Sequence, residues 1–345
     1  MTSIDTATHV REHERLAWTR IATGRDNATL VRASVDAGFR TYWRATVDDG
    51  DSCIVMDSPR DLEDVRPWLR IHALLEGGGV RVPRILAQDV ERGFLLLEDF
   101  GSRTYLQILD TDNADAELDA AVTQLLRLQA IPVPADLPDC DEALLTRDLR
   151  LFDEWFLGRH LGVVLDDGER DGMARVFRLL IDAALAQPQV LVHRDFMPRN
   201  LMPADDGPAV IDFQGAVRGP VAYDVTSLFK DAFLSWPEAR VDAWLDRYHA
   251  RAVSAGVPVP ARERFRRDAD FAGAHRHLKI LGIFARLCLR DDKPKYLADA
   301  PRFLAYLDGV TPKYPELAPL TEIVDRHLRP ALAQPAALDP QPSHP

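Results

Sequence analysis

The hydrophobic pattern of the chain changes its period once, near residue 101, and this change constrains the fold more than any other feature. Before it, short runs of β-branched and aromatic residues alternate with turn-forming residues, with two helical segments among them. After it, apolar residues recur at helical spacing over most of the chain, up to about Leu328. This order predicts an α+β protein with two lobes, in which a small antiparallel β-sheet lobe precedes a larger, mostly helical lobe.

The boundaries of the expected elements follow from turn signals in the sequence. Helices are predicted over residues 9–23 and 61–76. We therefore place the β-rich lobe at residues 1–100 and the helical lobe at residues 101–329, whereas the proline-rich stretch 330–345 predicts a flexible tail. The strands of the first lobe are expected at residues 30–33, 41–47, 53–56, 85–89 and 94–98.

Length and charge narrow the class of protein further. A chain of 345 residues is longer than one hydrophobic core usually organises, which also favours two lobes. Its 42 Lys and Arg residues against 54 Asp and Glu residues give a net charge of -12, which disfavours a nucleic-acid partner. The N-terminus lacks a signal-peptide pattern and no apolar run is long enough for a membrane span, so a cytoplasmic protein is expected. A monomer is assumed.

The segment from residue 190 to residue 215 carries the side chains that phosphoryl transfer needs. One apolar run leads into His193-Arg194-Asp195, Asn200 follows five residues after the aspartate, and a second apolar run leads into Asp212. One carboxylate accepts the proton of an attacking hydroxyl, whereas an amide oxygen and a second carboxylate hold Mg²⁺ against phosphate oxygens. The combination predicts a kinase with Asp195 as catalytic base and with Asn200 and Asp212 as Mg²⁺ ligands.

This pattern resembles the catalytic core of the protein-kinase-like superfamily. The following stretch, residues 219–224 (GPVAYD), is similar to the aminoglycoside phosphotransferase branch, whose members phosphorylate small molecules. Longer stretches resemble the bacterial anomeric kinases of cell-wall sugar recycling, which phosphorylate N-acetylmuramate and N-acetylglucosamine at C1. The resemblance runs from about Ser34 to Leu289, and its strongest stretches are residues 55–59, 93–99, 154–155, 158–162 and 223–238.

The resemblance implies ATP as co-substrate, Mg²⁺ as cofactor and an N-acetylated amino sugar as phosphoryl acceptor in peptidoglycan recycling. It places the adenine edge against the backbone of Glu98, Asp99 and Phe100. It also implies that His193 and Asp224 support the catalytic loop rather than react.

Three residues are candidates for contacts with the sugar, namely Glu154, Trp155 and Arg199. Sugars bind against aromatic faces, which favours Trp155 as a contact. Because Trp155 lies three residues from Phe152 on a helical stretch, packing in the core is the stronger interpretation of its position.

The chain departs from its superfamily in one respect that concerns ATP. Such kinases hold the phosphates with a lysine on the third strand, and this chain has no lysine before Lys230. Arg40 and Arg44 alternate on the expected second strand and share one face of it, so these arginines are the candidates for phosphate contacts. A second departure is Gly215, where the sugar kinases are expected to carry an aspartate.

Two alternative functions are compatible with the same residues. One is an aminoglycoside or other small-alcohol phosphotransferase of the same fold. The other is a nucleotide-binding pseudokinase that serves as an interaction module, which the missing lysine favours and the intact catalytic and metal-binding residues disfavour.

A cluster of basic side chains near the C-terminus has a different expected role. His275, His277 and Lys279 fall on one predicted helix. Because no carboxylate stands at a fixed spacing from them, we expect a solvent-exposed basic face rather than a metal site.

Overall fold

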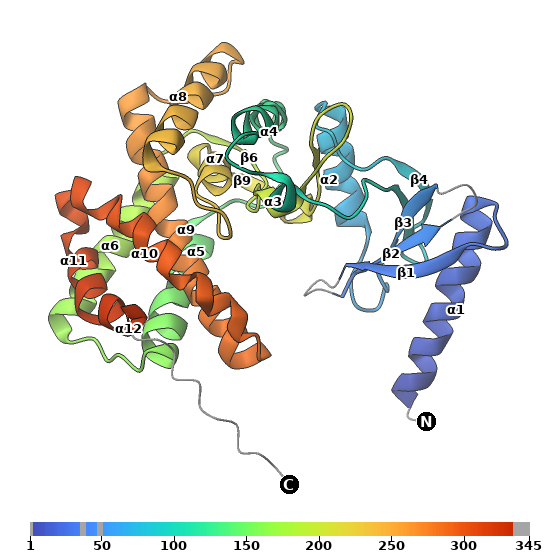
Figure 1. The fold of residues 1–345 in the computed structure, drawn as a ribbon, viewed down its shortest axis with the longest axis horizontal. Helices are drawn as coiled ribbons and strands as arrows, with labels where there is room; N and C mark the ends of the chain where they lie inside the picture. Colours follow the sequence, from blue (N-terminus) through green and yellow to red (C-terminus); the bar gives the residue numbers. More distant parts are fainter. Residues whose placement is uncertain (1–2, 35–38, 47–50, 334–345) are drawn as a thin grey trace, which may run out of the picture. The chain divides into compact units, whose positions relative to one another are not determined.

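The computed structural model describes residues 3–34, 39–46 and 51–333 (Figure 1). The tail expected from the sequence lies outside the described residues from residue 334 onward. The described chain forms two compact units. The first unit combines residues up to 131 with residues 198–215, and the second combines residues 132–197 with residues 216 onward.

A five-stranded antiparallel sheet dominates the first unit and confirms the β-rich part of the predicted α+β fold. The strand order is β1-β2-β3-β5-β4, so that β5 rather than β4 pairs with β3. All five strands fall where the alternating pattern predicts them. Their bounds are β1 Thr29–Ser34, β2 Thr41–Thr46, β3 Ser52–Asp57, β4 Ile85–Asp89 and β5 Phe94–Glu98.

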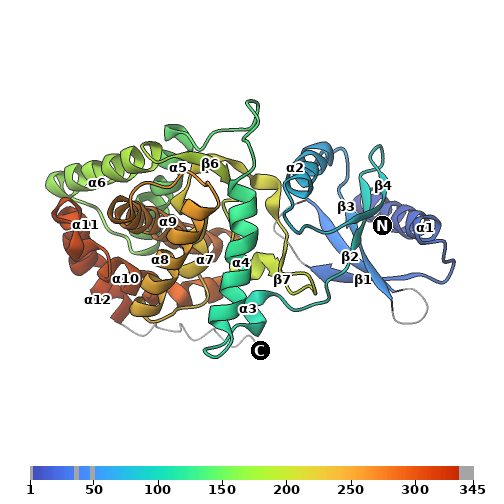
Figure 2. The ribbon, with the colours of Figure 1, turned by 90° about the horizontal axis from the view of Figure 1, so that it is seen from above.

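One face of this sheet packs against helix α1, Ser3–Thr23 (Figure 2). Trp18 of the helix stacks on Phe94 of β5 with ring centroids 5.3 Å apart. Asp57, buried at the end of β3, accepts hydrogen bonds from Arg11 at 2.7 Å and Arg15 at 2.9 Å. Because a buried carboxylate needs a charged partner, these contacts fix the helix on the sheet. The shared core contains Trp18, Ala45, Cys53, Val55, Phe94 and Leu96.

The first unit also contains a short β-hairpin, residues 201–210, which is flanked by the candidate site residues Asn200 and Asp212. Helix α2 spans Arg66–Gly77, and its Trp68 packs against Phe213 with centroids 5.0 Å apart. This contact attaches the residues that follow the hairpin to the helix. The remaining elements are α3 Tyr105–Ile108, α4 Ala114–Gln129, the 3₁₀ turns Pro198–Asn200 and Phe213–Gly215, and strands β7 Leu201–Met202 and β8 Ala209–Val210.

The second unit is helical, as the sequence predicts. Its centre is the 30-residue helix α9, Arg262–Asp291, which packs against α5, α6, α7, α8 and α10 of the same unit (Figure 2). A Cβ at Gly282 would lie 2.2 Å from the carbonyl oxygen of Leu151, so this position requires glycine. The bounds are α5 Glu142–Leu151, the π-helix Phe152–His160, α6 Asp167–Leu185, α7 Ala222–Phe229, α8 Glu238–Ser254, α10 Ala300–Asp308, α11 Ala318–Ile323 and α12 Arg329–Ala333.

The short strands beside the catalytic segment belong to two separate two-stranded antiparallel sheets. Strand β6, Gln189–Val192, pairs with β9, Val217–Pro220, whereas β8 pairs with β7. The two apolar runs that lead into His193 and Asp212 are therefore strands, with partners that the sequence pattern does not indicate. No helix in the described part of the chain combines the length and apolar character needed to cross a membrane.

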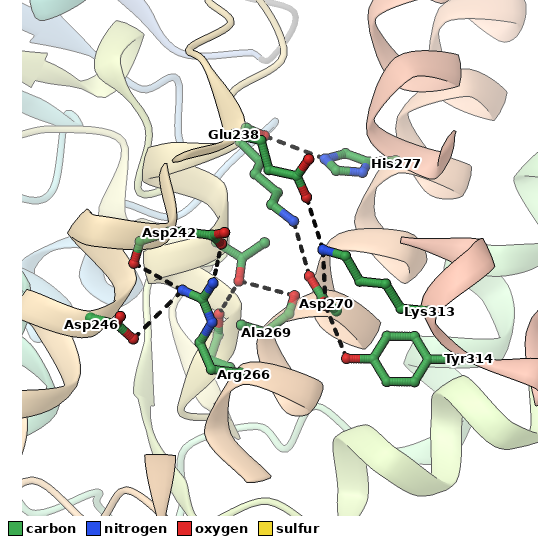
Figure 3. A network of polar contacts seen from close by, with 12 residues as sticks. Glu238, Asp242, Asp246, Arg266, Ala269, Asp270, His277, Lys313 and Tyr314 are labelled. Carbon is green, nitrogen blue, oxygen red and sulfur yellow. Dashed lines mark hydrogen bonds and ion pairs between the residues drawn. The ribbon is translucent and has the colours of Figure 1, made fainter. Parts of the chain in front are cut away.

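The prediction of an exposed basic face on α9 is wrong. His275, His277 and Lys279 are all buried, because neighbouring helices cover α9 along this stretch. Burial lowers the pKa of His275 to about 4 and that of His277 well below its usual value. Figure 3 shows His277 beside a network in which the hydroxyl of Tyr314 donates to Asp270 at 3.0 Å. Lys230 donates to the same carboxylate at 3.1 Å.

Candidate active site

The catalytic loop begins where β6 ends, in the second unit. The carboxylate of Asp224, fully buried at the start of α7, accepts hydrogen bonds from the N–H groups of His193 at 2.6 Å and Arg194 at 3.0 Å. Desolvation raises the pKa of Asp224 to about 6, and the charge of His193 and the two hydrogen bonds oppose this rise. Asp224 thus holds the backbone of the loop immediately before Asp195.

Backbone strain marks both segments of the candidate site. Among the described residues, Arg194, Asp212 and Asp292 are the non-glycine residues with positive φ, at 77°, 62° and 51°. Asp292 ends helix α9, a position where left-handed backbone is common. Arg194 directly precedes Asp195, and Asp212 is itself a candidate metal ligand. Backbone strain of this kind is retained mainly where function requires it.

The half-exposed carboxylate of Asp195 lies near the buried guanidinium of Arg276. The Asp195 side chain is 54% exposed, and its Oδ1 lies 3.6 Å from Nη1 of Arg276, whose side chain is only 3% exposed. Desolvation raises the pKa of Asp195, but the positive charges of Arg276 and Lys279 outweigh it, so the pKa is lowered overall. The carboxylate is therefore ionised at neutral pH, as a proton acceptor must be.

Asn200 and Asp212 lie close together in the first unit. The N–H of Ile211 donates to the carbonyl oxygen of Asn200 at 3.0 Å, which joins the two segments that carry them. Asp212 also accepts a hydrogen bond from Gln214 at 2.6 Å. Amide and carboxylate oxygens are the hard ligands that Mg²⁺ prefers, and one carboxylate with substrate phosphates suits its usual coordination. These two residues fit a metal site that ATP completes, whereas the described residues contain no group of three or more His, Cys, Asp or Glu side chains that could hold a metal.

The candidate nucleotide segment at the end of β5 is held by arginines. Arg81 and Arg84 form ion pairs with Glu98 at 2.6 Å and 3.1 Å, and the hydrogen bonds from Arg81 contribute most to lowering the pKa of Glu98 to about 2. The ring of Phe100 lies 4.8 Å from the guanidinium of Arg81. Because the Glu98 side chain is paired in this way, its carboxylate holds the local backbone in place.

The two arginines expected to contact phosphate already have carboxylate partners. Arg44 donates to Asp99 from Nε at 2.5 Å and to the carbonyl of Gly101 at 2.7 Å. Arg40 forms an ion pair with Glu63 at 3.3 Å. Their contact with nucleotide remains a prediction, and for Arg44 it requires exchange of an existing carboxylate partner.

The sugar candidates are divided between the units. Trp155, in the π-helix of the second unit, is partly buried, and Arg159 stacks over its ring at 4.0 Å. Its neighbour Glu154 is exposed, whereas Phe152 is fully buried in the core. Arg199, in the first unit, is exposed on the 3₁₀ turn that ends at Asn200.

Sequence reasoning missed the charged side chains that face Asp195 from α9. Arg276 and Lys279 are one turn apart on that helix, and Lys279 pairs with Asp148 of α5 at 2.8 Å. The sequence shows the basic residues, but their acidic partners lie more than 80 residues away, so no local spacing reveals the pairing.

A small antiparallel sheet, a helical unit built around α9 and a catalytic loop with this Asp-Asn-Asp spacing define a kinase-like phosphotransferase. The model of the phosphotransferase enzyme family matches residues 29–267, and the chain belongs to this family.

Relatives and solved structures agree with this assignment. The chain is 52% identical to the N-acetylmuramate/N-acetylglucosamine kinase of Pseudomonas putida, over 89% of this chain and 90% of that protein. It is 42% identical to the kinase of the same name from Neisseria meningitidis, over 84% and 88%. An ADP-bound aminoglycoside phosphotransferase, APH(2'')-Ib, has a TM-score of 0.57 at 16% identity, covering 84% of this chain and 96% of that one. A choline kinase from Streptococcus pneumoniae has a TM-score of 0.58 at 15% identity, covering 86% and 99%. These structures share the fold.

Proposed function

We propose that the protein is an ATP-dependent kinase that phosphorylates the anomeric hydroxyl of N-acetylmuramate, N-acetylglucosamine or both. The observation that carries the proposal is the 52% identity to the Pseudomonas putida kinase named for these two sugars, which extends over nine-tenths of that protein. The product, an amino-sugar 1-phosphate, suits peptidoglycan recycling, where it would feed the synthesis of nucleotide-sugar precursors. The cytoplasmic location and the monomeric state stay predictions.

Asp195 is the proposed general base. Its carboxylate accepts the proton of the attacking hydroxyl as the oxygen bonds to the γ-phosphorus of ATP, and ADP leaves. An anomeric hydroxyl is more acidic than an ordinary alcohol, so a carboxylate whose pKa is lowered can still serve. Asp224 supports this role because it fixes the backbone N–H groups of His193 and Arg194.

Asn200 and Asp212 are the proposed ligands of Mg²⁺. When bound, the ion neutralises phosphate oxygens during transfer. The support is the hydrogen bond from Ile211 to Asn200, which holds the two oxygen-bearing residues in one hairpin. Gly215 leaves this pair without the additional aspartate expected in the sugar-kinase branch.

The remaining substrate contacts are proposed from the residues predicted by the sequence. The backbone of Glu98, Asp99 and Phe100 receives the adenine, and Arg40 or Arg44 contacts the phosphates. Residues 1–100 form the nucleotide-covering lobe. Contacts with the sugar come from Glu154, Trp155 and Arg199.

A substrate panel tests the proposal directly. The protein is incubated with Mg²⁺-ATP and N-acetylmuramate, N-acetylglucosamine, an aminoglycoside or choline, and ADP release is measured, with Asp195→Asn as the matched control. We expect release with one or both of the N-acetylated sugars and with neither of the other two compounds. Release with the aminoglycoside or choline alone would favour a small-alcohol phosphotransferase, and ATP binding without release would favour a pseudokinase.

A further inference from the structure

Arg276 lies in the middle of α9 and contacts the catalytic loop on both sides of Asp195. Its Nη1 donates to the carbonyl oxygen of Arg194 at 3.0 Å, and its Nη2 lies 3.5 Å from Sδ of Met197. The same Nη1 is 3.6 Å from Oδ1 of Asp195. One buried guanidinium therefore spans the loop from the residue before the proposed base to the second residue after it.

The distance to the carboxylate distinguishes this contact from an ordinary structural salt bridge. A charge-assisted hydrogen bond between nitrogen and carboxylate is about 2.7–2.9 Å long. At 3.6 Å, the arginine stabilises the negative charge of Asp195 while its hydrogen bond goes to the backbone carbonyl of Arg194. The contact that supports the base thus differs from the one that fixes the loop.

Other charged groups also face Asp195 and are part of the same environment. His193 and Arg194 flank it on the loop, and Lys279 approaches from α9. Lys279 is held by Asp148 at 2.8 Å and lies 3.4 Å from the hydroxyl of Tyr223. Lys279 thus has a carboxylate partner at close range, whereas Arg276 forms its ion pair with Asp195 and also hydrogen-bonds Tyr223.

Burying an arginine costs free energy unless its charge is paired with a carboxylate or satisfied by hydrogen-bond acceptors. The other carboxylate that acts on Arg276 is Asp231, fully buried in the connection after α7, where one of its oxygens caps Phe233 and Leu234. A purely structural arginine would be expected to close a short bidentate pair with such a carboxylate. Arg276 instead donates to the backbone of the catalytic loop, and Tyr223 is a further hydrogen-bond partner.

We infer that Arg276 is a positioning residue for phosphoryl transfer, which fixes the Arg194–Met197 segment and places a buried positive charge beside the Asp195 carboxylate. The inference rests on the proposed role of Asp195 as base. It assigns to α9, about 80 residues from the catalytic loop in sequence, a direct influence on the reaction rate.

Two variants separate charge from geometry. Arg276→Gln removes the charge, so we expect kcat to fall at least ~10-fold with both KM values within about threefold, and the acid limb of the single-turnover rate to move up by about one pH unit. Arg276→Lys keeps the charge but cannot span the loop carbonyl and the carboxylate together. We expect its acid limb to stay near that of the wild type while kcat falls by a smaller factor.

Arg264→Gln is the matched control. Arg264 lies on the same helix and pairs with a buried carboxylate, Asp268, at 2.9 Å. Its loss should leave both the rate and the pH profile unchanged. Circular dichroism and thermal unfolding establish the folded fraction of each variant, so that rates are compared per folded molecule.

The outcomes distinguish this inference from the proposed function. If Asp195→Asn retains turnover, the base assignment fails, and the inference fails with it. If Asp195→Asn is inactive while folded Arg276→Gln keeps the wild-type rate and acid limb, only the inference is overturned. Should Arg276→Gln fail to fold, Arg276→Lys decides, because a wild-type kcat in that variant contradicts a positioning role.

Discussion

Replacement of Arg44 by alanine tests how the protein holds ATP phosphates without a third-strand lysine. Arg44 makes two hydrogen bonds to the carboxylate of Asp99 and one to the carbonyl of Gly101. Asp99 is only 2% exposed, whereas the Arg44 side chain is 29% exposed. The arginine is thus anchored on one side and accessible to solvent on the other, as a phosphate contact requires.

The structure gives two separate magnitudes for Arg44→Ala. Breaking a buried ion pair costs about 3–5 kcal/mol. Ser52 and the N–H of Gly101 remain bonded to Asp99, so we expect a loss of about 2 kcal/mol, or about 4–8 °C in Tm. If the guanidinium also contacts phosphate, the lost charge-assisted bonds contribute about 1.5–3 kcal/mol, which raises the KM for ATP about 10- to 150-fold.

Asp99→Asn is the matched control, because it weakens the same ion pair while leaving the arginine in place. We expect it to lower Tm without raising the KM for ATP, whereas Arg44→Ala changes both. The assay combines thermal unfolding with ATP titration at saturating sugar, and Arg40→Ala, which breaks the pair with Glu63, is measured in parallel. Wild-type ATP kinetics in both folded arginine variants, or equal KM increases in Arg44→Ala and Asp99→Asn, would refute phosphate binding by these arginines.

Three further predictions concern the catalytic segment. Asp195→Asn should cut turnover by at least ~10²-fold while ATP binding, measured by calorimetry, stays near wild type; near-normal turnover would remove Asp195 from the base role. Asp212→Asn should weaken Mg²⁺-dependent ATP binding and turnover together, and an unchanged Mg²⁺ titration would contradict its assignment as a ligand. Because burial raises the pKa of Asp224 to about 6 from its usual 3.8, the folded state loses about 2 kcal/mol from this group as the pH rises from 4 to 7. Urea unfolding should therefore show Asp224→Asn gaining stability relative to the wild type over that range, and a pH-independent difference would show that Asp224 ionises normally.

The local pattern predicted the elements of the fold but not the pairing of all of them. The five strands of the main sheet follow from alternation and turn residues, which act over a few neighbouring positions. Strand β6 pairs with β9, and β8 pairs with β7. The sequence does not predict these partners, because pairing depends on contacts that the spacing of apolar residues does not encode.

The candidate site divides in the same way. Asp195, Asn200 and Asp212 can be predicted from the sequence, because they lie within 18 residues of one another in a recognisable spacing. The sequence pattern favours an exposed face for His275, His277 and Lys279, because no carboxylate stands at a fixed spacing from them. Their burial depends on helices packed around α9 and on partners such as Asp148, which lie far away in sequence.

Phosphoryl transfer to N-acetylglucosamine and to its 1-O-methyl glycoside tests the central claim most directly. Both sugars are incubated with Mg²⁺-ATP and the wild-type protein, with Asp195→Asn as a blank, and phosphorus NMR locates the phosphate. Methylation blocks the anomeric oxygen and leaves every other hydroxyl in place. We predict an anomeric phosphate on the free sugar and no product from the glycoside. Phosphate on the methyl glycoside would contradict the account, because the reacting hydroxyl would then lie elsewhere on the sugar.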